Sequence, residues 1–190
     1  MNGTLTLLVI TTVSWSVRAL QTVQHIDLQK YMGKWHHVYG YYNDFNLQGF
    51  GSCVTSEYSM TNEGNIHMKN TILDMFQQKK EIHGLAYYSP GCLEPGKLKL
   101  QLENIPVQRD YWIYELGPVN LNNEYDYSVV SDRFRQSLFV LARDRTHFYN
   151  AYQPLVFDSL QSMGFRIPKR EYNPLEPITT FEGNPGFSSK

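Results

Sequence analysis

The sequence predicts an all-β fold: an eight-stranded antiparallel up-and-down β-barrel with one C-terminal α-helix packed on its outside. Segments rich in aromatic and β-branched residues recur at intervals of roughly 10–15 residues from Lys34 onward. Short links rich in Gly, Pro and Asn separate these segments, and a helical pattern follows only after the last of them. Closure into a barrel removes the exposed edges that a series of consecutive antiparallel strands would otherwise keep.

The first half of the barrel is predicted from one helical turn and four strands. Asp27 is placed to cap a helical turn that ends at Tyr31. The strands follow as KWHHVYGYYN, CVTSEYSM, NIHMKNTIL and KKEIHGLAYYS, with links that include DFNLQGFGS and TNEG. In the second strand Val54, Tyr58 and Met60 share one face, because side chains alternate between the two faces of a strand.

The second half begins after PGCLEPG, which has the Pro and Gly residues of tight turns. The next strand, KLKLQLEN, alternates more regularly than any other and directs Leu98, Leu100 and Leu102 inward. The segments DYWIYELG, EYDYSVVS and SLFVLAR supply three more strands.

A single helix is predicted after the last strand. Thr146 is placed to cap it, apolar residues continue at helical spacing to about Met163, and Gly164 is a stop signal. Pro154 lies inside this pattern and predicts a kink or a late helix start.

The composition and the terminal segments indicate the number of domains and the cellular location of the protein. A length of 190 residues suggests one domain, and the net charge of −1 gives no indication of a nucleic-acid partner. Residues 1–19 have the short apolar core and small-residue site of a secretory signal peptide, with cleavage predicted after Ala19. Residues 20–170 then form the barrel domain, and the Pro-rich residues 171–190 an extended or disordered tail. No later segment is long and apolar enough to span a membrane, so the protein is expected to be secreted and extracellular.

The inward faces predict an apolar interior with a few hydroxyl groups. A barrel of eight strands is just wide enough to enclose one small ligand, and such an interior is typical of a small-molecule pocket. The alternative is a barrel filled by its own side chains, which would make the protein a secreted interaction partner.

Two motifs make the chain resemble the lipocalin family. Gly33-Lys34-Trp35 opens the first strand and matches the family's Gly-x-Trp, and SLFVLARD resembles the last-strand motif, with Arg143 as its basic residue. Strand segments such as LEPGKLKLQL and DYWIYELG are most similar to the branch of apolipoprotein D and the insect bilin-binding proteins. The resemblance covers roughly residues 26–170 and implies structural roles for Gly33, Trp35 and Arg143, with the guanidinium over the Trp face in a cation–π pair at the closed end.

Candidate ligand-binding residues are those predicted on inward faces near the middle or mouth of the barrel. Tyr side chains offer a flat face for stacking and one hydroxyl, which suits conjugated or polycyclic ligands. The candidates are Tyr39, Tyr41, Tyr58, Met68, Asn70, Leu100, Tyr114, Tyr127 and Phe139.

Metal binding and catalysis are not predicted. His36 and His37 are adjacent in a strand and point to opposite faces, so they do not enter one metal site; His37 shares the inward face with Trp35. The sequence has no Gly-x-Ser-x-Gly nucleophile motif. An isomerase-like enzyme that uses a cavity thiol, with Cys53 as the candidate, stays open as an alternative.

Secretion makes Cys53 and Cys92 candidates for a disulfide. In the resembled topology, however, Cys53 lies at the open mouth and Cys92 in a turn at the closed end. A strand of about eight residues separates such positions by roughly 25 Å, and a disulfide needs Cα atoms within about 7 Å. Whether the two are bridged is left open.

The function that follows is a secreted carrier that reversibly binds a small hydrophobic molecule. The resemblance makes a linear tetrapyrrole, such as biliverdin, the first ligand to test, with retinoids, carotenoids, fatty acids and sterols behind it. No cofactor is required for this function. The sequence leaves open a cell-surface receptor as a further partner, and it does not define the oligomeric state.

Overall fold

The computed structural model describes residues 21–41, 51–74, 76 and 78–166 of the chain. The predicted signal peptide (residues 1–19) and the predicted tail (residues 171–190) lie outside the described residues, as do residue 20 and residues 167–170 of the predicted barrel domain. For residues 51–53 the backbone is described and the side chains are not.

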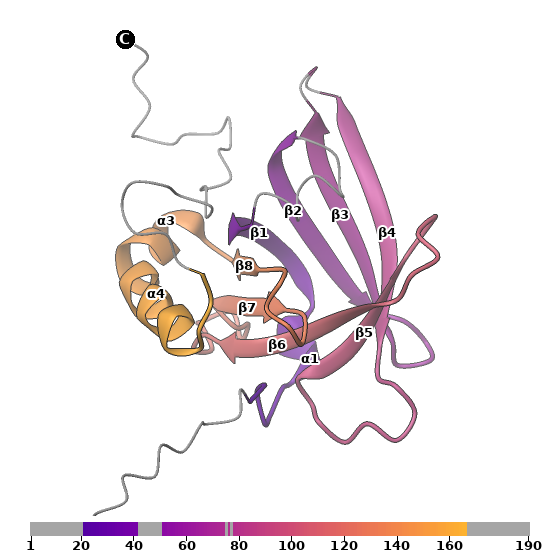
Figure 1. The fold of residues 1–190 in the computed structure, drawn as a ribbon. Coiled ribbons are helices and arrows are strands. Elements are labelled where there is room, and N and C mark those ends of the chain that lie inside the picture. Colours follow the sequence, from indigo (N-terminus) through magenta and orange to yellow (C-terminus); the bar gives the residue numbers. More distant parts are fainter. Residues whose placement is uncertain (1–20, 42–50, 75, 77, 167–190) are drawn as a thin grey trace, which may run out of the picture.

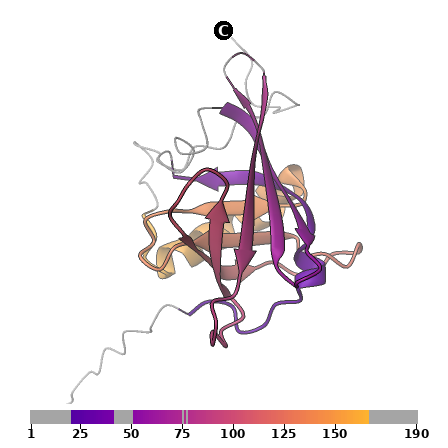
Figure 2. The same ribbon diagram turned by 90° about the vertical axis from the view of Figure 1, so that its right-hand side faces the viewer.

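Eight antiparallel strands form a closed barrel, as predicted (Figure 1). Each strand pairs with the next along the chain, and the last pairs with the first. The strands are β1 (Gly33–Gly40), β2 (Gly51–Met60), β3 (Ile66–Asp74), β4 (Lys79–Tyr87), β5 (Lys97–Leu102), β6 (Arg109–Leu116), β7 (Tyr127–Ser131) and β8 (Phe139–Ala142). The ribbon of β3 and β4 rises above the rest of the barrel on one side (Figure 2).

One short helix, α1 (Leu28–Tyr31), precedes the barrel at its lower end in Figure 1. As predicted, Asp27 caps it: the carboxylate accepts a hydrogen bond from the backbone N–H of Gln29 at 3.0 Å. Tyr31, the last residue of α1, is fully buried and belongs to the interior core of the barrel.

The C-terminal helical segment lies outside the barrel, at the left of Figure 1. It consists of α3 (Arg145–His147), a π-helical turn η1 (Phe148–Tyr152) and α4 (Gln153–Ser162). The cap is Asp144 rather than the predicted Thr146, because the Asp144 carboxylate accepts the backbone N–H of His147 at 2.8 Å. Pro154 lies in the first turn of α4, where its missing N–H costs no helical hydrogen bond, and Gly164 follows the helix with a φ of +73°.

Two separate apolar clusters stabilise this arrangement. The interior cluster lies inside the barrel and includes Trp35, Leu98, Leu102 and Ile113. The second cluster lies between the barrel wall and the helical segment. Its members are Val38, Tyr39, Tyr114, Tyr127, Val129, Leu138, Val140, Ala142, Phe148, Val156, Leu160 and Phe165, and we call it the helix-side cluster.

Two β-bulges decide which aromatic residues belong to which cluster. In β1, His37 pairs with Leu141 but Tyr39 pairs with Val140, so β1 carries one extra residue. In β6 the register shifts in the same way between Ile113 and Glu115. An extra residue inverts the alternation of faces, so residues beyond each bulge point to the opposite side of the wall.

Candidate ligand-binding cavity

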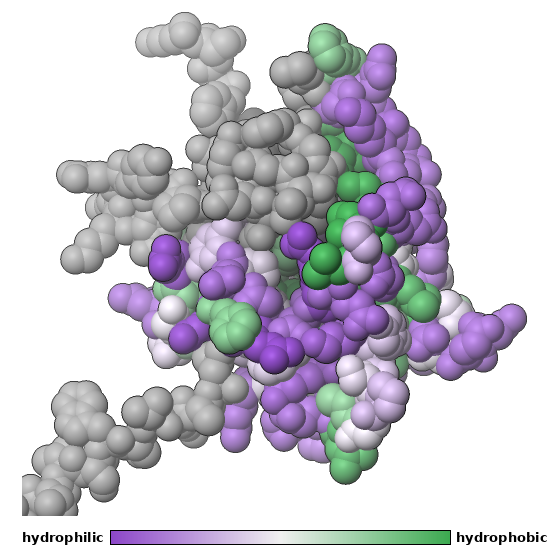
Figure 3. Space-filling view, turned by 45° about the vertical axis from the view of Figure 1, so that its right-hand side comes forward, coloured by the Kyte–Doolittle hydropathy of each residue, from purple (hydrophilic) through white to green (hydrophobic). Residues whose placement is uncertain are grey.

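The open half of the barrel contains a cavity of about 630 Å³. Its described lining residues are His37, Ser56, Tyr58, Met68, Asn70, Leu100, Leu102, Val107, Gln108, Arg109, Asp110, Tyr111, Val130, Ser131, Asp132, Phe134, Gln136, Ser137, Phe139 and Leu141. In the space-filling view, hydrophobic residues gather in a recess between polar surfaces (Figure 3). A barrel filled by its own side chains is therefore the wrong alternative, since the volume lies in the range of small-molecule sites.

Five of the nine candidate ligand-binding residues lie at this cavity. Tyr58, Met68, Asn70, Leu100 and Phe139 line it from four different strands. In β3, Met68 and Asn70 are buried on the same face, as the regular alternation of that strand predicts.

The other four candidates do not line the cavity, and the prediction for them is corrected. Tyr39, Tyr114 and Tyr127 belong to the helix-side cluster, and Tyr41 packs against it. Tyr39 stacks edge-on against Phe157 of α4, and Tyr127 donates a hydrogen bond from its hydroxyl to Glu115 at 2.7 Å. For Tyr39 the cause is the bulge in β1, which inverts the face that the Trp35–His37 alternation predicts.

A hydrogen-bonded chain of three side chains crosses one wall of the cavity. Ser56 donates to the amide oxygen of Asn70 at 2.6 Å, and the His37 Nε2 lies 2.7 Å from the Ser56 oxygen. Because the single Ser56 proton is given to Asn70, His37 Nε2 carries the proton in the His37–Ser56 bond. Burial lowers the pKa of His37 to about 3, with a smaller contribution from neighbouring His36, so the imidazole is neutral at physiological pH.

A second hydrogen-bonded chain forms the floor of the cavity. Tyr111 donates to the Tyr58 hydroxyl at 2.9 Å, the Tyr31 and Tyr111 hydroxyl oxygens are 2.8 Å apart, and Tyr31 lies 3.2 Å from Ser128 Oγ. Each hydroxyl has one proton, so Tyr31 donates to Tyr111 and Ser128 donates to Tyr31. Burial is the largest cause of the raised pKa of Tyr31, Tyr58 and Tyr111, which keeps the floor uncharged.

Tyr111 and Ser56 also line the cavity, although they are not among the residues predicted from the sequence. Tyr111 was recognisable in principle, because it alternates with Ile113 in the segment DYWIYELG. Ser56 is polar, so hydrophobicity does not identify it as an inward residue, although it shares the face of Val54 and Tyr58 in β2.

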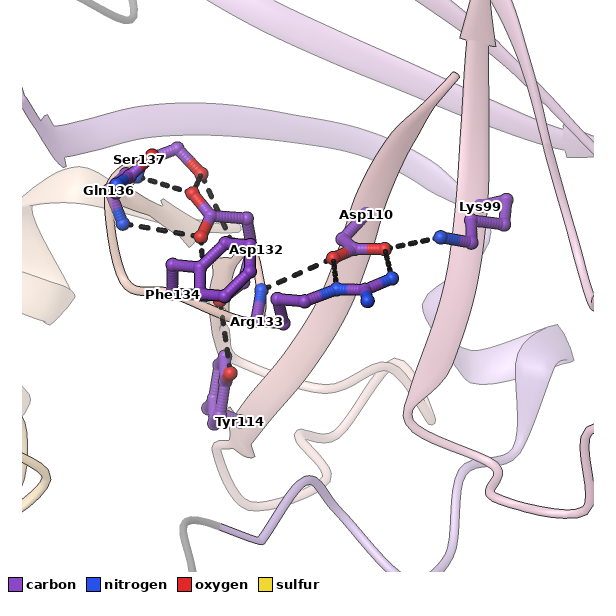
Figure 4. Close-up of polar contacts among 8 residues, drawn as sticks. All are labelled: Lys99, Asp110, Tyr114, Asp132, Arg133, Phe134, Gln136 and Ser137. Atoms are coloured by element: carbon purple, nitrogen blue, oxygen red, sulfur yellow. Dashed lines mark hydrogen bonds and ion pairs between the residues drawn. The ribbon is translucent and has the colours of Figure 1, made fainter.

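Ionic contacts fix the loop between β7 and β8 at the mouth. Asp110, next to the start of β6, bonds Lys99 Nζ at 2.6 Å and Arg133 Nε at 2.6 Å (Figure 4). The hydrogen bond from Arg133 is the main cause that lowers the pKa of Asp110 to about 2, with Lys99 adding to it. The Asp132 carboxylate accepts backbone N–H groups of its own loop, including those of Phe134 and Ser137 (Figure 4).

Gly33, Trp35 and Arg143 lie together at the closed end. The Arg143 guanidinium lies 3.8 Å from the centre of the Trp35 ring, and it donates to the backbone oxygens of Met32 at 2.6 Å and Lys34 at 2.7 Å. Gly33 has a φ of +92°, and a Cβ there would lie 3.2 Å from the Arg143 guanidinium. Trp35 is fully buried, and its indole N–H donates to the backbone oxygen of Tyr31 at 2.8 Å, so the three residues act on the framework rather than on the cavity.

Cys92 is a free thiol in the turn between β4 and β5, so the candidate bridge to Cys53 is not formed. Its Sγ lies 3.6 Å from the backbone oxygen of Lys97. The side chain of Cys53 lies outside the described residues, and the hypothesis of a cavity thiol remains a prediction.

Within the described ranges, no three His, Cys, Asp or Glu side chains are grouped so that they could hold a metal ion. His67 and His83 do contact each other on neighbouring strands, with 3.3 Å between their ring nitrogens. None of the helices in the described part of the chain has the length and apolar character needed to cross a membrane.

Known proteins with similar sequences include a bacterial lipoprotein and apolipoprotein D. The chain is 30% identical over 129 residues to the outer membrane lipoprotein Blc of Vibrio cholerae, a match that covers 67% of this chain and 71% of Blc. It is 29% identical over 90 residues to apolipoprotein D of Mus musculus, covering 47% of this chain and 46% of the mouse protein. The chain thus spans just under half of the mouse apolipoprotein D that it matches.

Solved structures share the fold at low sequence identity. The cockroach allergen Per a 4 superposes with a TM-score of 0.56 at 16% identity, covering 83% of this chain and 90% of the allergen. Insecticyanin from the tobacco hornworm Manduca sexta superposes with a TM-score of 0.54 at 15% identity, covering 76% of this chain and 77% of insecticyanin. The family model described as a lipocalin-like domain matches residues 26–173. With its closed eight-stranded barrel, its outer helix and this match, the chain belongs to the lipocalin family.

Proposed function

We propose that the protein is a secreted carrier that reversibly binds one small hydrophobic molecule in its barrel cavity, without catalysis. Lipocalins bind small hydrophobic ligands. The observation that supports this function most directly is the cavity of about 630 Å³ with apolar walls and an uncharged floor.

The cavity chemistry favours a flat conjugated ligand. Tyr58, Tyr111 and Phe139 present aromatic faces or edges to the interior, and Met68 and Leu100 supply adaptable apolar surface. A linear tetrapyrrole such as biliverdin is the first ligand we propose, followed by retinoids, fatty acids and sterols. Insecticyanin and the crustacyanins, whose structures are similar, support the fold on which this choice rests.

Titration of the purified protein with biliverdin tests this function, with absorption in the visible range and quenching of Trp fluorescence as readouts. Trp35 reports on the cavity, since its ring lies 5.2 Å from Tyr31, which stacks on the cavity residue Tyr58 at 5.5 Å. We expect saturable binding in the wild type. Leu100→Trp should weaken it at least tenfold by filling the cavity, whereas Leu155→Trp, at an exposed position on α4, should leave it unchanged.

Failure of biliverdin, retinol and a fatty acid to bind would contradict the carrier function. Equal affinity of Leu100→Trp and the wild type would place the ligand outside the cavity.

Secretion is proposed from residues 1–19. Expression of the full chain in a secretory cell line should release a protein whose N-terminal residue, determined by sequencing, is Leu20. A product that stays in the cell with its first residues intact would contradict this part of the proposal.

A further inference from the structure

The floor of the cavity is unfavourable for a charged ligand group, because it is buried and carries no charge. The hydroxyl protons of Ser128, Tyr31 and Tyr111 are all donated within the floor chain. The guanidinium of Arg143, at the closed end below this floor, lies against the Trp35 ring and donates to backbone oxygens. A carboxylate that reached the floor would therefore lose its hydration and gain no cation, with only the Tyr58 hydroxyl, the last member of the chain, left as a donor.

The mouth of the cavity differs from the floor because it carries charge. Three of the described lining residues are ionised: Arg109, Asp110 and Asp132. Both carboxylates are already engaged, Asp110 with Lys99 and Arg133, and Asp132 with donors of its own loop (Figure 4). A cationic ligand therefore finds no free carboxylate among the described residues of this rim.

Arg109 is the remaining charge. It precedes Tyr111 by two residues in β6, so both side chains are on the inward face, and it pairs across the sheet with Leu100, another lining residue. The side chain of Arg109 makes no hydrogen bond or ion pair with any other residue that the structure describes, and it is exposed to solvent. Its guanidinium is available for a carboxylate, which it can bind through two parallel hydrogen bonds.

We propose that the cavity selects amphiphilic anions, which enter with the apolar end first and leave their carboxylate at the mouth on Arg109. This inference rests on the proposed carrier function and adds to it the charge class and the orientation of the ligand. The hydrophobic body lies against Met68, Leu100 and Phe139, and its inner end meets the uncharged tyrosine floor.

Two pairs of ligands with matched bodies test the proposal: retinoic acid against retinol, and biliverdin against its dimethyl ester. Dissociation constants are measured by Trp quenching for the wild type, Arg109→Gln and the control Arg145→Gln, which removes a positive charge on α3, outside the cavity lining. In the wild type we expect the acid of each pair to bind about tenfold more tightly than the uncharged partner. Arg109→Gln should abolish this preference without changing the affinity for retinol, and Arg145→Gln should keep it.

The outcomes separate this inference from the carrier function. If retinol and retinoic acid bind equally well, or if Arg109→Gln keeps the preference for the acids, the carrier function stands and the role of Arg109 is refuted. If no member of either pair binds, both proposals are refuted. Thermal unfolding of Arg109→Gln confirms that the variant is folded, which is expected because the side chain is exposed and has no partner in the described structure.

Discussion

At the scale of single residues, burial determines the protonation of the cavity wall. His37 lies on the inward face of β1, contacts Phe139 edge-on and donates to Ser56. Its pKa of about 3 in the folded protein is well below the ordinary value of 6.5, because burial disfavours the charged imidazolium. Between these two values the unfolded chain binds a proton that the folded protein does not bind, so stability falls as the pH is lowered.

His37→Gln tests this effect, because Gln can still donate to Ser56 but does not titrate. The free energy of unfolding of the wild type should fall by up to about 1.4 kcal/mol for each pH unit between roughly pH 6.5 and the folded pKa. Urea unfolding at pH 7 and pH 5 should show a smaller difference for His37→Gln than for the wild type. An identical pH dependence of the two proteins would contradict a neutral buried His37.

At the scale of elements, the β7–β8 loop is held at the mouth by Asp110. The low pKa of Asp110 means that its ion pairs stabilise the fold above the unfolded value of about 4, and that this stabilisation is lost as the pH falls toward 2. Lys97 and Arg133 also lie over the ring of Trp112, so the same outer face of β6 carries ionic and aromatic contacts.

Asp110→Asn should lower the free energy of unfolding at pH 7 by about 0.5–1 kcal/mol, since the pairs are partly exposed. It should also flatten the loss of stability between roughly pH 4 and pH 2, where Asp110 titrates in the wild type. Denaturant midpoints across this range measure both effects, and 1 M NaCl should reduce the difference at pH 7. A variant with the wild-type acid profile would exclude Asp110 as the titrating group.

The closed end depends on Arg143, whose guanidinium joins α1, β1 and the β6–β7 connection. It donates to the backbone oxygens of Lys30, Lys34 and Tyr125, among others. Removing it leaves several backbone oxygens without a donor and exposes the face of Trp35.

Arg143→Ala should lower the free energy of unfolding by roughly 2–4 kcal/mol and change ligand affinity less than about twofold. Denaturation midpoints with and without ligand, together with the dissociation constant at a temperature where the variant is folded, provide the measurement. Arg145→Ala is the matched control on α3. An unchanged midpoint for Arg143→Ala would disprove its structural role.

The order of the elements could be predicted from the sequence, whereas the faces of some residues could not. Regular strands such as β3 and β5 show which side chains are inside, because apolar and polar residues alternate in them. In β1 and β6 both faces carry aromatic residues. The bulge in each strand inverts the alternation of inward and outward side chains, and the order of apolar and polar residues does not reveal it. Tyr39 was therefore assigned to the wrong side of the wall, although the strand was correctly predicted.

At the scale of the whole molecule, ligand binding and helix docking use opposite sides of the same barrel wall. The cavity side is lined by Met68, Leu100 and Phe139, and the helix-side cluster is built around Phe148, Val156 and Leu160. The wall itself is continuous, so the loss of helix packing should affect global stability without changing the cavity lining.

Leu160→Ala tests this separation, because Leu160 is fully buried in the helix-side cluster and does not line the cavity. The free energy of unfolding should fall by about 2–4 kcal/mol. At a temperature where the variant is fully folded, the dissociation constant for the bound ligand should stay within about twofold of the wild type. A large loss of affinity in the folded variant would show that the helix and the cavity are coupled.

The bulges in β1 and β6 have a further consequence for how this barrel can vary. Before the bulge in β1, a substitution at His37 alters the lining of the cavity. Beyond the bulge, a substitution at Tyr39 alters the packing of the helical segment against the barrel. A single inserted residue thus makes each strand serve two independent sets of contacts. A change at His37, the β1 residue that lines the cavity, can therefore alter ligand preference without disturbing the attachment of the helix, and the reverse holds for Tyr39 beyond the bulge.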